Sequence, residues 1–225
     1  MEKAIQIGFE VAILIFSVVI HEVSHGYAAL WLGDKTAHYA GRLTLNPIKH
    51  LDPFGSVLLP VLLLLLTQGQ GPVIGWAKPV PFNPYNLRNP FRGFGVRKNW
   101  GPAIVGAAGP CANLLLALGF GLLIRIAPGL AQDLSGSFLF NFMQIASAIV
   151  LLNLLLMIFN LMPVPPLDGS KVLFALLPYQ WRNVELFLEQ YGFILLLLLI
   201  FLFSHWLFYP VLLLFRLITG MLPIL

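Results

Sequence analysis

Charged residues are scarce in this chain. Asp, Glu, Lys and Arg make up 10% of its 225 residues, whereas hydrophobic residues make up 59%. A soluble domain carries roughly 25% charged residues, so this sequence lacks the polar side chains that would cover a water-soluble fold. It therefore predicts an all-α polytopic membrane protein, because helices satisfy their own backbone hydrogen bonds in lipid. No basic run alternates with aromatic residues, and no nucleic-acid partner is expected.

Cysteine is also nearly absent. The single cysteine, Cys111, excludes an intrachain disulfide and a cysteine-rich metal site, and its apolar neighbours predict a side chain packed between helices. The sequence has no long linker, low-complexity tract or internal repeat, so we expect one integral-membrane domain over residues 1–225. The first apolar segment has no small-residue cleavage site after it, so we expect it to be retained rather than removed as a signal peptide.

Long apolar runs divide the chain into membrane spans. A span needs roughly 20 apolar residues, and three core spans are predicted at about 5–32, 103–126 and 138–161. A C-terminal membrane region at about 191–218 forms one helix or two, because Pro210 interrupts it. The apolar run Val57–Leu66 has ten residues. This is too short for a crossing and indicates a re-entrant or hairpin segment.

Positive charge predicts the orientation in the membrane. The stretch Gly75–Lys98 contains five Lys or Arg residues and no acidic residue, which places it in the cytoplasm. The link Pro128–Ser137 has Asp133 and no basic residue, which fits the outer side. Lys171 and Arg182 follow the third core span and again indicate the inside. We therefore expect a multi-pass protein of the cell membrane, with the inner ends of the first and third core spans on the cytoplasmic side.

The first span contains the pattern His21-Glu22-Val23-Ser24-His25. Residues four apart lie on one face of a helix, so both imidazoles can bind one metal ion while Glu22 lies beside it. Ionisable side chains at membrane depth are costly and are usually functional. The alternative is a chance match, which is rare in a chain with five His and five Glu residues.

A hydrolytic zinc site needs a third protein ligand and an open position for water. Asp168 is the best-placed candidate, since it follows the third core span and shares the membrane side of His21 and His25. The proline-rich segment Pro163–Pro166 stiffens the chain before it, and Gly169 permits a sharp turn after it. The alternative is that Asp168 caps a short helix that follows.

These residues predict hydrolysis by a metal-activated water. One zinc ion per chain lowers the pKa of the water and stabilises the oxyanion. Glu22 accepts the proton as general base and passes it to the leaving amine. Asn160 and Asn113 are the candidate amides for hydrogen bonds to the oxyanion or the substrate backbone. Alternatively, each amide joins two helices through hydrogen bonds.

Three motifs follow one another along the chain. They are His21-Glu22-x-x-His25, Gly109-Pro110-x-x-Asn113 and Asn160-x-x-Pro163-x-Pro165-Pro166-Leu167-Asp168-Gly169. Their order resembles that of the site-2 protease family of intramembrane zinc metalloproteases, peptidase family M50, over about Ile5 to Lys171. The resemblance implies a catalytic core of three helices. It also implies that the zinc ligands are His21, His25 and Asp168, that Glu22 is the catalytic base, and that Asn160 lies near the substrate.

Two further segments resemble a compact bacterial subgroup of that family, without PDZ or CBS domains. They are Gly41–Pro47 and Gly75–Pro81, which flank the short apolar run. This resemblance implies a re-entrant or hairpin lid beside the site, where a substrate strand can pair, in the bacterial cytoplasmic membrane. His50 and Asp52 lie between the two segments, and their residue types leave open a second place for metal ligation.

The favoured function is an intramembrane zinc endopeptidase that cleaves transmembrane proteins or signal-peptide-like segments. A metal transporter would also carry His and Asp in the membrane, but transporters tend to contain inverted repeats. A non-proteolytic metal-binding membrane protein would have no use for Glu22. The aromatic stretch Phe201–Tyr209, which includes His205, indicates a membrane interface rather than a metal site.

Overall fold

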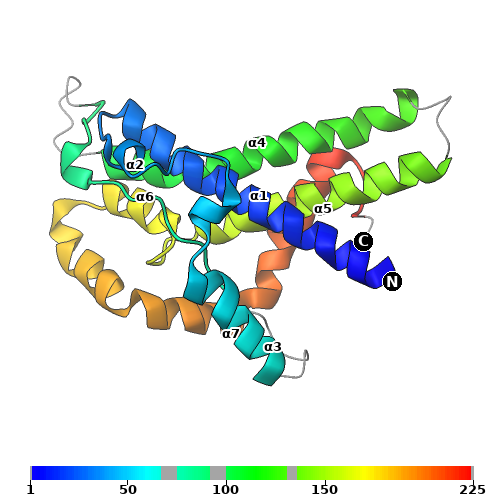
Figure 1. Cartoon of the computed structure of the whole chain (residues 1–225). Coiled ribbons are helices and arrows are strands. Elements are labelled where there is room, and N and C mark those ends of the chain that lie inside the picture. Colours follow the sequence, from blue (N-terminus) through cyan, green and yellow to red (C-terminus); the bar gives the residue numbers. More distant parts are fainter. Residues whose placement is uncertain (1, 67–74, 92–99, 131–135, 224–225) are drawn as a thin grey trace.

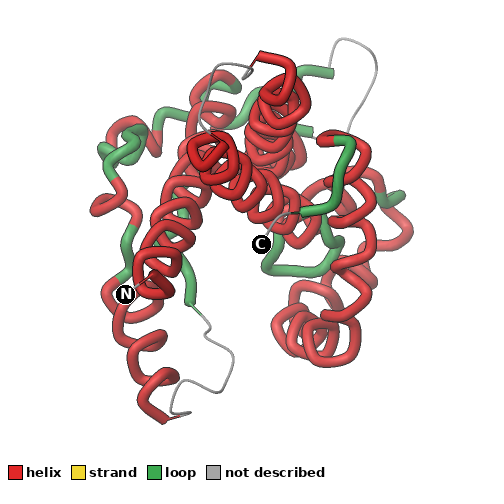
Figure 2. The backbone as a smooth tube through the Cα atoms, turned by 90° about the vertical axis from the view of Figure 1, so that its right-hand side faces the viewer, coloured by secondary structure: helices red, strands yellow, loops and turns green. Residues whose placement is uncertain are grey.

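Helices and the loops between them make up the described part of the chain. The computed structural model describes residues 2–66, 75–91, 100–130 and 136–223, and these residues contain no strand. Figure 2 shows the same arrangement, with helical tubes joined by loops. The chain is therefore an all-α polytopic membrane protein, as its composition predicted.

Four long helices and several short elements follow one another. The long helices are α1 (Glu2–Trp31), α4 (Gly101–Leu130), α5 (Gly136–Asn160) and α7 (Arg182–Thr219). The short helices are α2 (Thr36–Tyr39), α3 (Leu59–Leu66) and α6 (Asp168–Leu176). Single turns complete the list: the 3-10 turns η1 (Pro47–His50), η3 (Pro84–Asn86) and η5 (Tyr179–Trp181), and the π-helical turn η2 (Pro53–Leu58).

In the described part of the chain, four stretches are long and apolar enough to cross a membrane: Gly8–Trp31, Gly101–Ala127, Gly136–Asn160 and Tyr179–Leu202. The first three agree closely with the predicted core spans. The fourth begins well before the predicted start at 191, because the helix runs on through the charged residues near the start of α7. Beyond this stretch α7 continues through Pro210 as one helix, and Figure 1 shows its ribbon turning between the orange and red parts.

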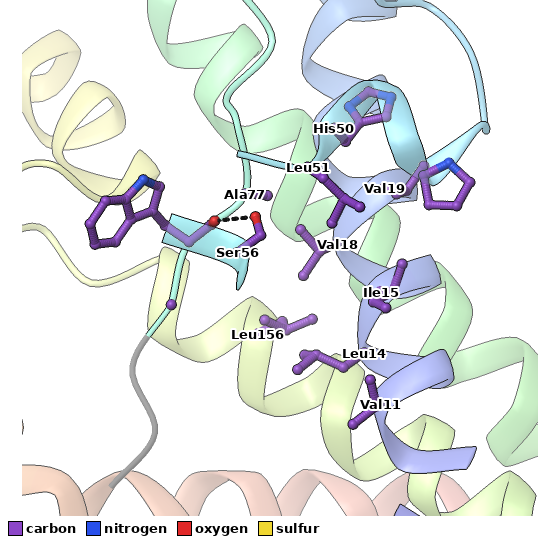
Figure 3. Close-up of a pocket in the computed structure, with 13 residues that line it drawn as sticks. Val11, Leu14, Ile15, Val18, Val19, His50, Leu51, Ser56, Ala77 and Leu156 are labelled. Carbon is purple, nitrogen blue, oxygen red and sulfur yellow. Dashed lines mark hydrogen bonds between the residues drawn. The ribbon is translucent and has the colours of Figure 1, made fainter. Parts of the chain in front are cut away.

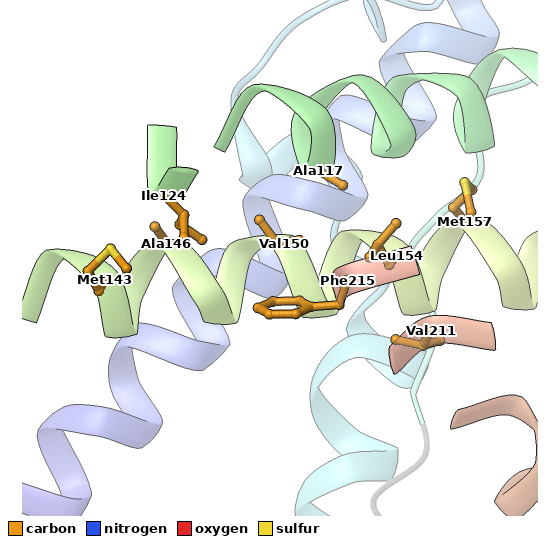
Figure 4. Packing of buried hydrophobic residues seen from close by; sticks show 9 residues of the cluster. All are labelled: Ala117, Ile124, Met143, Ala146, Val150, Leu154, Met157, Val211 and Phe215. Carbon is orange, nitrogen blue, oxygen red and sulfur yellow. The ribbon is translucent and has the colours of Figure 1, made fainter. Parts of the chain in front are cut away.

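The hydrophobic core lies where α4, α5 and the last turns of α7 meet. Figure 4 shows Val150 and Leu154 of α5 beside Phe215 and Val211 of α7, with Ala117 of α4 on the other side. These side chains are fully buried. In a bilayer this packing, rather than water exclusion, holds neighbouring helices together. The end of α7 is thereby fixed to the helix pair that follows the first span.

The end of α1 anchors a long loop. Gly33 has a φ of 101°, which ends the helix in the left-handed region. The buried carboxylate of Asp34 then accepts hydrogen bonds from the hydroxyl of Thr36, the backbone N–H of Asn83 and the side chain of Asn86. In addition, the Arg88 N–H donates to the carbonyl of Leu32. The extended segment before η3 is therefore fixed at the C-terminal end of the first span.

The apolar run after η1 does not form a long helix. Helix α3 has eight residues, which corresponds to about 12 Å of helix against about 30 Å of hydrocarbon. The N–H of Trp76 donates to the carbonyl of Gly55 at 3.1 Å, so the chain returns beside η2. Within the described residues α3 ends at Leu66, and the re-entrant or hairpin course of this run stays a prediction.

Two minor predictions have different outcomes. Cys111 is exposed on α4, so the prediction that it packs between helices is wrong. The rotation of α4 turns Cys111 away from the bundle, while Gly109 and Pro110 face inward. His205 is exposed and makes a ring contact with Tyr209, in keeping with an interfacial side chain.

The charges used to predict the membrane orientation are only partly described. Arg92, Arg97, Lys98 and Asp133 lie outside the described residues.

The core predicts a stability difference between two leucines. Leu154 is fully buried, whereas Leu115 on α4 is 69% exposed. We expect Leu154→Ala to lower the free energy of unfolding by about 2–3 kcal/mol, because the cavity removes packing contacts. Leu115→Ala should leave it nearly unchanged. Unfolding in detergent micelles measures both, and equal stability of the two variants would contradict the packing described.

Asp34 predicts a dependence of stability on pH. Burial alone would raise its pKa, but hydrogen bonds from Thr36, Asn83 and Asn86 outweigh this and hold the pKa below its usual value. A group with a lowered folded pKa stabilises the protein above its unfolded pKa of about 3.9, and this contribution is lost as the pH falls further. Asp34→Asn should be less stable than the wild type at pH 7, and the difference should shrink below about pH 4. A pH-independent difference in unfolding would contradict this.

Candidate metal centre

His21 and His25 lie one turn apart on α1 and both face α4. The Nδ1 atom of His21 is 2.6 Å from Oδ1 of Asn113, and Nδ1 of His25 is 2.6 Å from the carbonyl oxygen of Val105. Both partners are acceptors, so each Nδ1 carries the proton. In a neutral imidazole the other nitrogen, Nε2, then presents a lone pair.

A chain of polar side chains fixes the orientation of Asn113. Its Nδ2 donates to Oδ1 of Asn153 at 2.8 Å, and Nδ2 of Asn153 donates to the Ser17 hydroxyl at 3.0 Å and to the Ile149 carbonyl at 2.8 Å. The Oδ1 atom of Asn113 therefore faces His21. All three polar side chains are buried. The network links α1, α4 and α5, and it holds the ring of His21 in one tautomer.

Asp168 is the first residue of α6 and faces the two imidazoles. Its Oδ2 atom is 3.1 Å from Nε2 of His21 and 3.0 Å from Nε2 of His25, and the two Nε2 atoms are 3.0 Å apart. The residue at the N-cap position of α6 is Leu167, and no side chain caps this helix, so the capping alternative is not realised. Gly169 is required for a reason other than the predicted turn, because a Cβ there would collide with the carbonyl oxygen of Leu161.

The three facing atoms fit a metal ion. Two Nε2 lone pairs and a carboxylate oxygen repel one another unless positive charge lies between them. A proton can lie along only one of the three contacts, whereas a metal ion satisfies all three. Two imidazoles and one carboxylate are the ligand set of catalytic zinc sites. Among the described residues, this is the one group of His, Cys, Asp and Glu side chains spaced to hold a metal.

The other predicted residues line the same small cavity. It has a volume of about 190 Å³, and its walls include Glu22 and Asn160 together with the three facing side chains. Oε2 of Glu22 accepts a hydrogen bond from the backbone N–H of Val80 at 2.9 Å. Nδ2 of Asn160 donates to the Leu156 carbonyl, one turn back on α5, at 2.9 Å. All five residues predicted from the sequence are thus brought together, whereas Asn113 has its amide engaged behind His21.

The extended segment after α3 forms one wall of this cavity. Pro79, Val80 and Phe82 line it. The guanidinium of Arg42 is buried and donates to the carbonyls of Lys78 at 2.6 Å and Pro79 at 3.3 Å. The two segments predicted to form a lid therefore meet beside the site. Sequence reasoning missed the contact between Glu22 and Val80, since a backbone donor has no signature in the sequence.

The residues between those segments hold the loop. Nε2 of His50 donates to the Thr44 carbonyl at 2.8 Å, and the His50 carbonyl accepts from the Lys78 N–H. The carboxylate of Asp52 accepts from the backbone N–H groups of Phe54 and Gly55. These contacts account for the Asp52 carboxylate and for Nε2 of His50, whereas Nδ1 of His50 is buried without a hydrogen-bond partner among the described residues. Neither residue belongs to the metal group.

A second, larger cavity lies next to the first. It has a volume of about 430 Å³, and Figure 3 shows its apolar wall of α1 side chains, Val11, Leu14 and Val18, opposite Leu156. Ala77 lines this cavity, whereas Pro79, two residues later, lines the smaller one. On α5, Leu156 and Asn160 are one turn apart and line the larger and the smaller cavity respectively. An apolar space therefore adjoins the polar site within the membrane-spanning part.

Two glycines of α4 make a matched test of the metal centre. A Cβ on Gly109 would lie 2.5 Å from Nε2 of His25 and 2.6 Å from Nε2 of His21, whereas a Cβ on Gly119 would meet nothing within 4 Å. Gly109→Ala should therefore displace the imidazoles and lower zinc affinity by at least the roughly 10- to 100-fold typical of second-layer changes. Gly119→Ala should bind zinc like the wild type. Chelator competition measures both, and unchanged affinity in Gly109→Ala would contradict the geometry.

Comparisons with known proteins identify the relatives of this chain. A model of Peptidase family M50 matches residues 124–202. A Bacillus subtilis protein named "Putative zinc metalloprotease YwhC" is 42% identical over 187 residues, which cover 83% of this chain and 77% of that protein. Two proteins named "Putative zinc metalloprotease Rip2", from Mycolicibacterium smegmatis and Mycobacterium tuberculosis, are 29% and 28% identical.

The alignments with the two Rip2 proteins cover 83% and 81% of this chain but 64% and 62% of the relatives. The chain thus spans somewhat less than two thirds of their length. No solved structure matches the chain. The 42% identity over most of both chains, together with the family match, decides the classification. This chain belongs to peptidase family M50, the site-2 protease family.

Proposed function

We propose that this protein is an intramembrane zinc endopeptidase, which hydrolyses peptide bonds within or near the membrane segments of its substrates. The convergence of two imidazole nitrogens and one carboxylate oxygen within 3.1 Å carries this proposal. The two histidines belong to a stretch apolar enough to cross the membrane. The names of the relatives, which describe zinc metalloproteases, support the same reaction class.

The proposed roles follow from the positions of the side chains. His21, His25 and Asp168 would hold one zinc ion, which would supply a Lewis acid and a water of lowered pKa. Glu22 accepts the proton of the water and donates it to the leaving amine. The Val80 N–H fixes one carboxylate oxygen of Glu22, so the carboxylate keeps a defined direction in the cavity.

Substrate binding is assigned to the walls of the two cavities. The side chain of Asn160 lines the smaller cavity, and we propose that it hydrogen-bonds the substrate backbone. The larger cavity is apolar and adjoins it, so it suits the side chains of a transmembrane or signal-peptide-like segment. A helix must unwind before its backbone can enter a site of about 190 Å³. Substrates with helix-breaking residues near the scissile bond should therefore be cleaved more readily.

The proposed location is the cell membrane, with the site toward the cytoplasm. The metal group lies near the C-terminal end of α1. The described basic residues Lys78 and Arg88 belong to the loop that is anchored at that end. The positive-inside rule then places this end in the cytoplasm. Cysteine labelling from either side of the membrane tests the orientation, since a cysteine in this loop should react only from the inside.

Glu22→Gln provides the test of the proteolytic mechanism. The amide cannot accept the proton, so cleavage of tagged transmembrane substrates in liposomes should fall roughly 10²- to 10⁴-fold. Zinc content should remain about one per chain, because Glu22 is not among the three facing ligands. Glu189→Gln, on an exposed position of α7, serves as the control.

Three outcomes are informative in that test. Loss of cleavage with retained zinc supports the assignment of Glu22 as the base. Equal cleavage by the Glu22→Gln variant and the wild type would sink the mechanism. Zinc in the wild type without cleavage of any substrate in the panel would instead favour a non-proteolytic metal-binding protein.

A further inference from the structure

The two carboxylate oxygens of Asp168 have different partners. Oδ2 faces Nε2 of His21 and Nε2 of His25, at 3.1 and 3.0 Å. Oδ1 instead accepts a hydrogen bond from Nζ of Lys171 at 2.8 Å. Lys171 lies three residues further along α6, so its ammonium reaches back over the first turn of that helix. Only one oxygen of the carboxylate is therefore directed at the metal centre.

The surroundings of Lys171 hold its side chain in this direction. A Cβ on Gly106 of α4 would lie 3.0 Å from Cδ and 3.1 Å from Cβ of Lys171, so the aliphatic stem passes directly over that glycine. The ammonium lies 5.4 Å from the centre of the Phe82 ring, within the range of a cation–π interaction. The side chain is 31% exposed, and it lines the small cavity. Gly106 of α4 and the ring of Phe82 thus position the side chain of Lys171, which would otherwise extend into solvent.

We propose that Lys171 is a positioning residue that restricts Asp168 to ligation through Oδ2 alone. A carboxylate can bind a metal through one oxygen or through both. Binding through both would fill the fifth position, beside the water, into which a hydrolytic zinc site expands in the transition state. The ammonium donates a hydrogen bond to Oδ1 and partly neutralises the negative charge of the carboxylate, so Oδ1 is a weaker metal ligand than Oδ2. This inference rests on the proposed function of the site, and it assigns to Lys171 the task of keeping one position open.

Two other roles would fit the same position. The contact with Asp168 can be an ordinary ion pair between residues three apart, which stabilises α6 by a few tenths of a kcal/mol. Alternatively, the ammonium can hydrogen-bond the substrate directly, since it lines the cavity. The first role predicts a loss of stability with no change at the metal. The second predicts a changed KM, again with no change at the metal.

Cobalt(II) in place of zinc reports the number of ligands directly. Four-coordinate cobalt absorbs visible light more strongly than five-coordinate cobalt, because a near-tetrahedral site mixes the metal p and d orbitals more fully. We compare the full-length wild type with Lys171→Met and with Lys171→Arg, which keeps the charge and the donors. Lys49→Met serves as the control, since Lys49 is exposed on η1.

The expected result separates metal binding from hydrolysis. Lys171→Met should bind cobalt at least as tightly as the wild type in chelator competition, because Asp168 now contributes both oxygens. Its visible absorption should be weaker, and cleavage of a transmembrane substrate by the zinc form should fall roughly 10- to 100-fold in kcat. Lys171→Arg should restore the wild-type spectrum and most of the activity. If Lys171→Met does not fold, Lys171→Gln carries the same comparison.

An unchanged cobalt spectrum and unchanged affinity in Lys171→Met would overturn the inference, whatever happens to activity. A spectrum that differs equally in Lys171→Arg and Lys171→Met would also overturn it, since the charge and donors would then be irrelevant. Failure of the wild type to cleave any substrate would count against the proposed function alone. The cobalt spectra of the variants would still decide the role of Lys171.

Discussion

Three atoms that all present lone pairs lie within 3.1 Å of one another, and the structure around them depends on the positive charge that this arrangement requires. His21 and His25 come from α1, and Asp168 comes from α6. Without a cation between them, these side chains would repel one another in a buried site, where screening by water is weak. A metal ion bound there would turn that repulsion into a crosslink between two helices that are far apart in the sequence.

The surrounding residues keep the three atoms in place. Gly109 lets α4 approach both imidazoles, and the buried series Asn113–Asn153–Ser17 sets the tautomer of one of them. The glycine at the start of α6 lets the chain pass close to the end of α5, which brings Asp168 into the site. The packing of α4 against α5 therefore positions the candidate metal centre directly, because the same helices provide the core and the hydrogen-bond partners of the two histidines.

The sequence predicted that His21, His25 and Asp168 meet, because each left a local signal. The spacing of His21 and His25 on one helix needs no tertiary information, and Asp168 followed from the number of membrane crossings between it and the histidines. The three core spans followed from hydropathy. The start of α7 was missed because its first turns carry charge, which hydropathy treats as a boundary, although the helix continues through it.

Other features depend on how helices are rotated and on backbone groups, and a single sequence carries neither. Asn113 was recognised as unusual in an apolar helix, but the direction of its amide is set by the neighbours on α1 and α5. The Val80 N–H that holds Glu22, and the division of the Asp168 oxygens between the histidines and Lys171, arise from a loop and a short helix folding against the bundle.

The most direct test of the central claim is X-ray absorption at the zinc edge on the purified protein in detergent. The account predicts one zinc per chain with four nitrogen or oxygen neighbours at about 2.0–2.2 Å, including two imidazoles. In Asp168→Ala, the two imidazole signals should remain while one oxygen neighbour is lost. A wild-type spectrum without imidazole scattering, or one that Asp168→Ala leaves unchanged, would contradict the claim that these three side chains form the metal site.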